Sequence, residues 1–109
     1  MPPKTFHDLA TISADRARSG RLYHEFLRVP ALSAGVYVLA AGATDPQRPH
    51  KEDELYYVVR GRGRMRVAGE EQGVKAGSVI FVAAEVEHQF FDISEELEVL
   101  VFFAPAESE

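Results

Sequence analysis

The spacing of apolar residues changes along the chain near residue 21. Before that point, Phe6, Leu9 and Ile12 recur at roughly helical intervals, and Gly20 can end a helix in the left-handed conformation that glycine tolerates. After it, short apolar runs are separated by glycine, proline or charged clusters, a pattern typical of β-sandwiches and barrels. We therefore predict one helix within residues 5–19, followed by an all-β region.

Glycine and proline residues divide the β region into runs of strand length. Pro30 cannot donate to a sheet ladder, and Gly42, with two prolines after it, opens a loop. The tripeptide Gly69-Glu70-Glu71 has the composition of a hairpin tip. The predicted strands lie near residues 22–28, 35–41, 54–60, 64–68, 78–82, 86–92 and 97–104.

Composition and charge limit the partners that we expect. A chain of 109 residues suffices for one core, so we predict a single domain with a helical segment at 1–20 and a β-barrel at 21–104. The net charge of -5 disfavours binding to nucleic acid or anionic membranes, and no apolar run approaches the ~20 residues of a membrane span. Without a signal-peptide pattern, we expect a cytoplasmic protein. An apolar edge over 21–28 predicts a homodimer.

His50 and Glu54 lie close enough in the sequence to share a metal ion if the chain bends between them. In a straight strand their α-carbons would be about 13 Å apart at ~3.3 Å per residue, too far to meet on one ion. The intervening Lys51-Glu52-Asp53 is wholly charged, which predicts a bend that turns both side chains inward. The chain has no cysteine, so any metal site must use imidazole, carboxylate or amide groups.

His88 is the candidate for a third ligand. Period-two alternation in its strand places it on one face with Phe90 and Asp92, and a histidine among inward apolar positions needs a partner. With His50 and Glu54 it would complete a set of two imidazoles and one carboxylate. Such a facial set leaves coordination positions open for substrate, water or dioxygen.

The spacing of these residues resembles the two sequence motifs of the cupin superfamily. The first motif is matched in every interval by Gly42, five residues, Arg48-Pro49-His50, three residues, Glu54, six residues and Gly61. The second is matched in spacing by Gly77, five residues, Ala83-Ala84-Glu85, two residues, His88, three residues and Asp92. Arg48 replaces the first histidine of the family pattern, and the proline, glycine and asparagine of the second motif are changed.

The resemblance implies a double-stranded β-helix, or jelly-roll, barrel like that of small single-domain bacterial cupins. It also implies that His50, Glu54 and His88 are three of the four usual ligands of one divalent ion. Arg48 stands in the fourth position, and a guanidinium has no lone pair to donate. Its neighbour Gln47 could supply an amide oxygen instead. Iron, manganese, nickel and zinc all remain open, because these ligand types do not select among them.

The predicted site supports functions of different classes. The leading hypothesis is a metal-dependent enzyme, dioxygenase-like or isomerase-like, that acts on a small organic substrate in the barrel, with its catalytic residues unassigned. The alternatives are a noncatalytic module that binds or senses a small molecule, and a sheet that mediates assembly. Arg48 could pair with a carboxylate or phosphate of the substrate. The remaining candidates for the substrate pocket are the inward residues Tyr56, Phe90 and Asp92.

Overall fold

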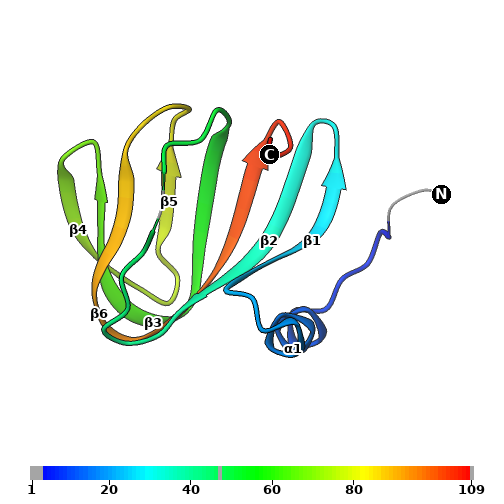
Figure 1. The fold of residues 1–109 in the computed structure, drawn as a ribbon, viewed down its shortest axis with the longest axis horizontal. Helices are drawn as coiled ribbons and strands as arrows, with labels where there is room; N and C mark the ends of the chain where they lie inside the picture. The colour runs from blue at the N-terminus through cyan, green and yellow to red at the C-terminus, as the bar shows by residue number, and fades with distance from the viewer. Residues whose placement is uncertain (1–3, 47, 109) are drawn as a thin grey trace.

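The computed structural model describes residues 4–46 and 48–108, which form one short helix beside a rolled antiparallel sheet (Figure 1). The elements are α1 (Leu9–Ser19), β1 (Tyr23–Val29), β2 (Leu32–Leu39), β3 (Asp53–Val67), β4 (Glu70–Lys75), β5 (Val79–Val82) and β6 (His88–Ala104). The sheet order is β1-β2-β6-β3-β4, and β5 pairs with the first part of β3. The all-β jelly roll with an N-terminal helix is therefore confirmed.

Helix α1 begins and ends where its capping residues allow. The Asp8 carboxylate accepts a hydrogen bond from the Thr11 N–H at 3.1 Å, so the helix starts at the next residue rather than at residue 5. Gly20 ends it with φ of 71°, as predicted. The Ser13 hydroxyl donates to the Glu98 carboxylate of β6, which fastens the helix to the sheet.

Strands β3 and β6 are longer than the sequence predicted, because each bends where an interruption was expected. Their pairing shifts register three times between Val58 and Arg64. At Gly61, φ is 100° and an added Cβ would lie 2.1 Å from the backbone oxygen of Glu96, so glycine is required at this close approach. Strand β4 begins at Glu70, inside the hairpin tip predicted at residues 69–71, because the turn lies at residues 68–69. The bends roll the sheet upon itself.

The inner face of the roll holds the core. In β3, Tyr56 and Val58 are buried, whereas Leu55 and Tyr57 alternate with them on the outer face and are exposed.

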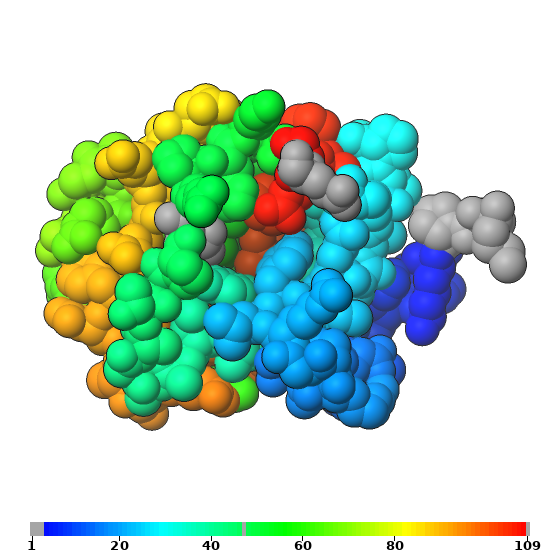
Figure 2. Space-filling model, viewed as in Figure 1, coloured from blue at the N-terminus to red at the C-terminus, as the bar shows by residue number. Residues whose placement is uncertain are grey.

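The space-filling view shows the C-terminal segment lying between the strands near the N-terminus and the start of β3 (Figure 2). Among the described residues, no helix is long and apolar enough to cross a bilayer.

The close approach at Gly61 gives a stability prediction. Gly61→Ala should lower the free energy of unfolding by about 2–4 kcal/mol, because it adds backbone strain to a clash with the Glu96 carbonyl. Gly73→Ala is the matched control, since nothing lies closer to its added Cβ than 3.9 Å, and it should change stability by less than about 1 kcal/mol. Urea denaturation measures both, and equal effects would contradict this account of the bend.

Candidate metal centre

The structure brings His50, Glu54 and His88 together inside the roll. One potential ligand atom from each lies within 4.8 Å of the others. Glu54 is the second residue of β3, and His88 is the first of β6. His50 lies in a loop rather than at a strand end, directly before a bend at residues 51–52. The Nε2 atom of His88 and Oε1 of Glu54 are 3.1 Å apart, and both side chains are at most 1% exposed.

Hydrogen bonds fix the orientation of the two buried side chains. The Val86 carbonyl lies 3.0 Å from Nδ1 of His88, and because a carbonyl only accepts, Nδ1 carries a proton and Nε2 is the ring nitrogen that faces Glu54. The Tyr56 hydroxyl is hydrogen-bonded to the Glu54 side chain. Burial lowers the pKa of His88, but the Glu54 side chain and the Val86 carbonyl outweigh this effect and raise the pKa overall.

The facing pair has the character of a cation-binding site. Oε1 of Glu54 and Nε2 of His88 are both buried, and neither has a hydrogen-bond partner among the described residues other than the facing atom. Two ligand atoms that each lie about 2.1 Å from one ion at a near-right angle would be about 3 Å apart, which agrees with the observed 3.1 Å. The residues present therefore fit a divalent ion in type and separation.

Asp45 supports this centre and was missed by sequence reasoning. Its side chain accepts hydrogen bonds from the Tyr37 hydroxyl at 2.7 Å and from the Phe90 N–H at 2.9 Å, and its backbone carbonyl accepts one from Gln89. Burial raises the pKa of Asp45, although the Phe90 and Tyr37 bonds oppose the shift. The loop that carries His50 is thus fastened to β6 beside His88. A single aspartate in a loop belongs to no sequence pattern that would mark this role.

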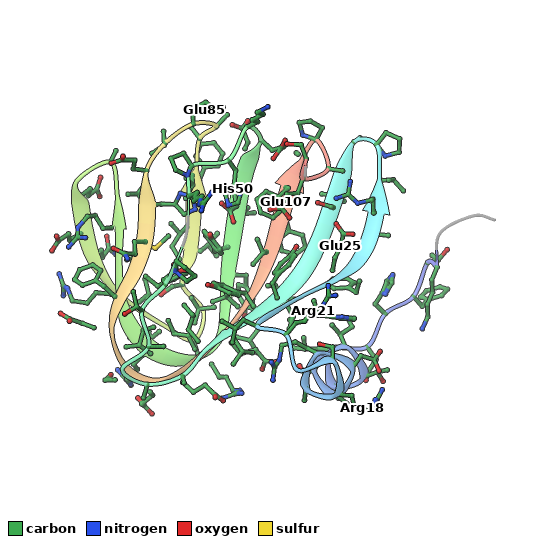
Figure 3. The ribbon with its side chains drawn as sticks, in the orientation of Figure 1. Arg18, Arg21, Glu25, His50, Glu85 and Glu107 are labelled. Atoms are coloured by element: carbon green, nitrogen blue, oxygen red, sulfur yellow. The ribbon has the colours of Figure 1, made fainter. Side chains whose placement is uncertain are left out.

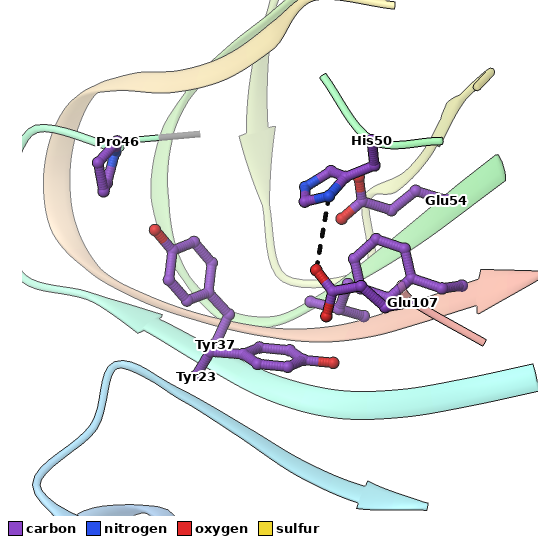
Figure 4. Close-up of a pocket in the computed structure, with 8 residues that line it drawn as sticks. Tyr23, Tyr37, Pro46, His50, Glu54 and Glu107 are labelled. Atoms are coloured by element: carbon purple, nitrogen blue, oxygen red, sulfur yellow. Dashed lines mark ion pairs between the residues drawn. The ribbon is translucent and has the colours of Figure 1, made fainter. Parts of the chain in front are cut away.

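Glu107 is a second residue that the sequence did not indicate. Oε2 of its carboxylate lies 3.5 Å from Nδ1 of His50 (Figures 3 and 4). The segment after β6 is fastened to the β1–β2 hairpin, because the Glu107 N–H donates to the Ser33 hydroxyl at 2.9 Å and Arg28 donates to the Glu107 carbonyl at 2.6 Å. Burial, followed by the charge of Glu54, raises the pKa of Glu107.

A cavity of about 200 Å³ opens beside the cluster. Its lining consists of ligand candidates, aromatic rings and a few further side chains: Tyr23, Tyr37, Pro46, His50, Glu54, Val101, Phe103 and Glu107 (Figure 4). The Phe103 ring packs edge-on against His50 at a centroid distance of 5.0 Å. The open side of the ligand cluster therefore faces a space large enough for a small organic molecule.

The predicted pocket residues do not all reach this cavity. Tyr56 contacts the site through Glu54, whereas Phe90 is fully buried against the Tyr56 ring as a core residue. Arg48 is exposed and outside the cavity lining. Asp92 is also exposed, because its φ of 47° at a bulge breaks the strand alternation that would have turned it inward. Gln47 lies outside the described residues.

The roll and its buried cluster define a jelly-roll barrel with an interior two-histidine, one-carboxylate centre. The cupin domain family matches residues 35–104, and the chain belongs to this family. All three cluster residues lie within the matched range, whereas Tyr23 and Glu107 lie outside it.

Comparisons with individual proteins agree with this assignment. The chain is 48% identical over 100 residues to an uncharacterized protein of Streptomyces coelicolor, covering 92% of this chain and 95% of that protein. An RmlC-like cupin from Shewanella frigidimarina has a TM-score of 0.71 at 24% identity, over 77% of this chain and 75% of that chain. KdgF from Halomonas sp. has a TM-score of 0.70 at 21% identity, over 76% of each chain. The two solved structures support the fold.

The role of Asp45 can be tested by removing its side chain. Asp45→Ala leaves the buried Phe90 N–H and Tyr37 hydroxyl without an acceptor, and we expect a loss of about 2–4 kcal/mol in unfolding free energy. Tyr37→Phe removes one of these hydrogen bonds without leaving the amide unpaired, and should lose only about 0.5–1.5 kcal/mol. Chemical denaturation gives both values. A smaller loss for Asp45→Ala than for Tyr37→Phe would refute the anchoring role.

Proposed function

We propose that this chain is a metal-dependent cupin enzyme that binds one divalent ion between His50, Glu54 and His88. The observation that carries the proposal is the buried pair of Oε1 of Glu54 and Nε2 of His88, two possible ligand atoms that lie 3.1 Å apart and have no other hydrogen-bond partner in the described part of the chain. Two facing lone pairs repel each other in an apolar interior unless a cation or proton lies between them. A divalent ion would satisfy both atoms and recruit His50.

The proposed reaction takes place on a small organic substrate in the cavity. Three protein ligands would leave coordination positions open toward this space, and the bound ion would supply Lewis acidity or, if it is redox-active, activation of dioxygen. Tyr56 keeps the Glu54 carboxylate in place, and the aromatic lining limits the access of water. Dioxygenase-like and isomerase-like chemistry both fit this arrangement, with iron, manganese, nickel or zinc as the ion.

The alternative is a noncatalytic cupin module that binds or senses a small molecule. The observation that favours it is Arg48, which occupies the position of the usual first histidine ligand yet is exposed. Loss of a ligand can leave a cupin that binds a molecule without transforming it. Substrate turnover by the reconstituted protein supports the enzyme, whereas ligand binding without turnover supports the module.

Metal analysis tests the centre directly. Purified protein reconstituted with Fe²⁺, Mn²⁺, Ni²⁺ or Zn²⁺ should retain about one ion per chain. His88→Ala should lower the affinity for that ion by more than the roughly 10- to 100-fold that is typical of changes outside the ligand set. His24→Ala, which removes a histidine of β1 outside the cluster, is the control and should bind normally.

The same proteins allow a second readout that does not depend on activity. At 100 times the dissociation constant, the bound ion should stabilise the wild type and His24→Ala by about 2.7 kcal/mol relative to chelated protein. The ion should not stabilise His88→Ala. A wild type that retains none of the four metals after reconstitution would rule out the enzyme and leave the noncatalytic module.

We also propose that the protein is a homodimer. Strand β1 is at the edge of the sheet, with Leu22 beside it 51% exposed. A second apolar surface lies on the outer face, where exposed Leu55 pairs with Phe81 and exposed Tyr57 with Val79. A twofold partner commonly covers exposed sheet edges and apolar surfaces such as these two.

Light scattering at micromolar concentration should give the mass of a dimer. Leu22→Lys and Phe81→Lys, tested separately, locate the interface, because burying an unpaired charge should dissociate the dimer only where the substituted residue is covered. A monomeric wild type would contradict the proposal.

A further inference from the structure

The cavity beside the metal centre is acidic and aromatic. Tyr23, Tyr37 and Phe103 contribute rings, Glu107 contributes a carboxylate, and no lysine or arginine of the described residues lines the cavity. The sequence suggested Arg48 as the partner of an anionic substrate, but this side chain is exposed and outside the lining. Because the Glu107 carboxylate lines the cavity and the Arg48 guanidinium does not, the cavity favours a positively charged substrate.

Glu107 is held in place before any ligand arrives. Hydrogen bonds from its N–H to Ser33, from Arg28 to its carbonyl and from the Ala106 N–H to the Pro30 carbonyl fix the backbone on both sides of the side chain. A group that is already oriented loses little conformational entropy when it binds a ligand. The Glu107 carboxylate lines the cavity, with Oε2 3.5 Å from Nδ1 of His50.

Tyr23 adds a ring and an unused polar group to the same cavity. Its hydroxyl is buried and has no hydrogen-bond partner among the described residues. The ring lies against Gly35 of β2, where an added Cβ would be 2.4 Å from the hydroxyl oxygen, so this placement requires glycine. It meets the Tyr37 ring edge-on, with centroids 6.4 Å apart. Tilted rings of this kind form the corner of an aromatic cage rather than a flat stack.

We propose that the cavity binds a small organic cation of the alkylammonium type, with its charge against Glu107 and the rings of Tyr23, Tyr37 and Phe103. Aromatic faces attract cations through their quadrupole, and this attraction increases when the cation is desolvated. A carboxylate beside the rings adds direct charge pairing. In the enzyme proposed above, an oxygen-bearing end of such a cation would face the ion, and this detail alone rests on the proposed function.

The test compares probes of matched shape and different charge. Choline, its neutral isostere 3,3-dimethylbutan-1-ol and the anion 3,3-dimethylbutanoate are titrated by calorimetry and by ligand-observed NMR. The titrations use the full-length protein, both chelated and loaded with Zn²⁺. Choline should bind on the order of tenfold more tightly than the alcohol, and the anion most weakly. Measuring chelated protein separates this inference from the metal proposal, because the cation preference does not require the ion.

Two isosteric variants assign the preference to Glu107. Glu107→Gln should reduce the ratio of choline to alcohol affinity to near one, while Glu71→Gln, which removes an exposed carboxylate on β4, should leave the ratio unchanged. Thermal melting confirms that both variants are folded. Equal binding of choline and the alcohol by the wild type, tighter binding of the anion, or no choline binding at millimolar concentration overturns the proposal. A Glu107→Gln variant that loses Zn²⁺ affinity but keeps the choline preference also overturns it, and assigns Glu107 to the orientation of His50.

Discussion

The proposed metal centre depends on the folding of two paired strands back upon themselves. Strands β3 and β6 are antiparallel, with His88 opposite Val67, thirteen residues along β3 from Glu54. In a straight ladder that separation would be about 43 Å at ~3.3 Å per residue, yet the two side chains meet at 3.1 Å. Only the bends around Gly61 can account for the difference. The glycine that admits the Glu96 backbone is therefore as necessary to the site as any ligand.

Once the strands have folded back, the surrounding hydrogen bonds prevent the ligand pair from relaxing. An unsatisfied buried polar group costs about 1–3 kcal/mol, so Glu54 and His88 would separate if their side chains were free to turn. Tyr56 holds the carboxylate and the Val86 carbonyl holds the imidazole. Asp45 then fastens the incoming loop to β6. The side chains are thus held in the arrangement that the proposed ion would need.

The sequence predicted that His50, Glu54 and His88 lie together, but it did not predict the shape of the cavity. The spacing of His50, Glu54 and His88 carried the signal, because fixed intervals between ligand-type residues survive bends in the strands. The expected alternation of inward and outward side chains along a strand was less reliable. It failed at Asp92, where a positive φ reverses it. Glu107 could not have been predicted, since its position depends on backbone contacts to a hairpin more than 70 residues earlier in the chain.

Part of the cavity wall comes from outside the region that supplies the centre. The ligands lie within the region shared with the cupin domain family, on strands whose bends also build the core. Tyr23 and Glu107 lie outside that region, on an edge strand and on the segment after β6, and neither contributes to the core bends. Substitutions at Tyr23 can therefore alter the cavity wall away from the ligands, whereas Glu107 also contacts His50. In a fold that serves many chemistries, this separation allows one metal centre to be combined with different substrates.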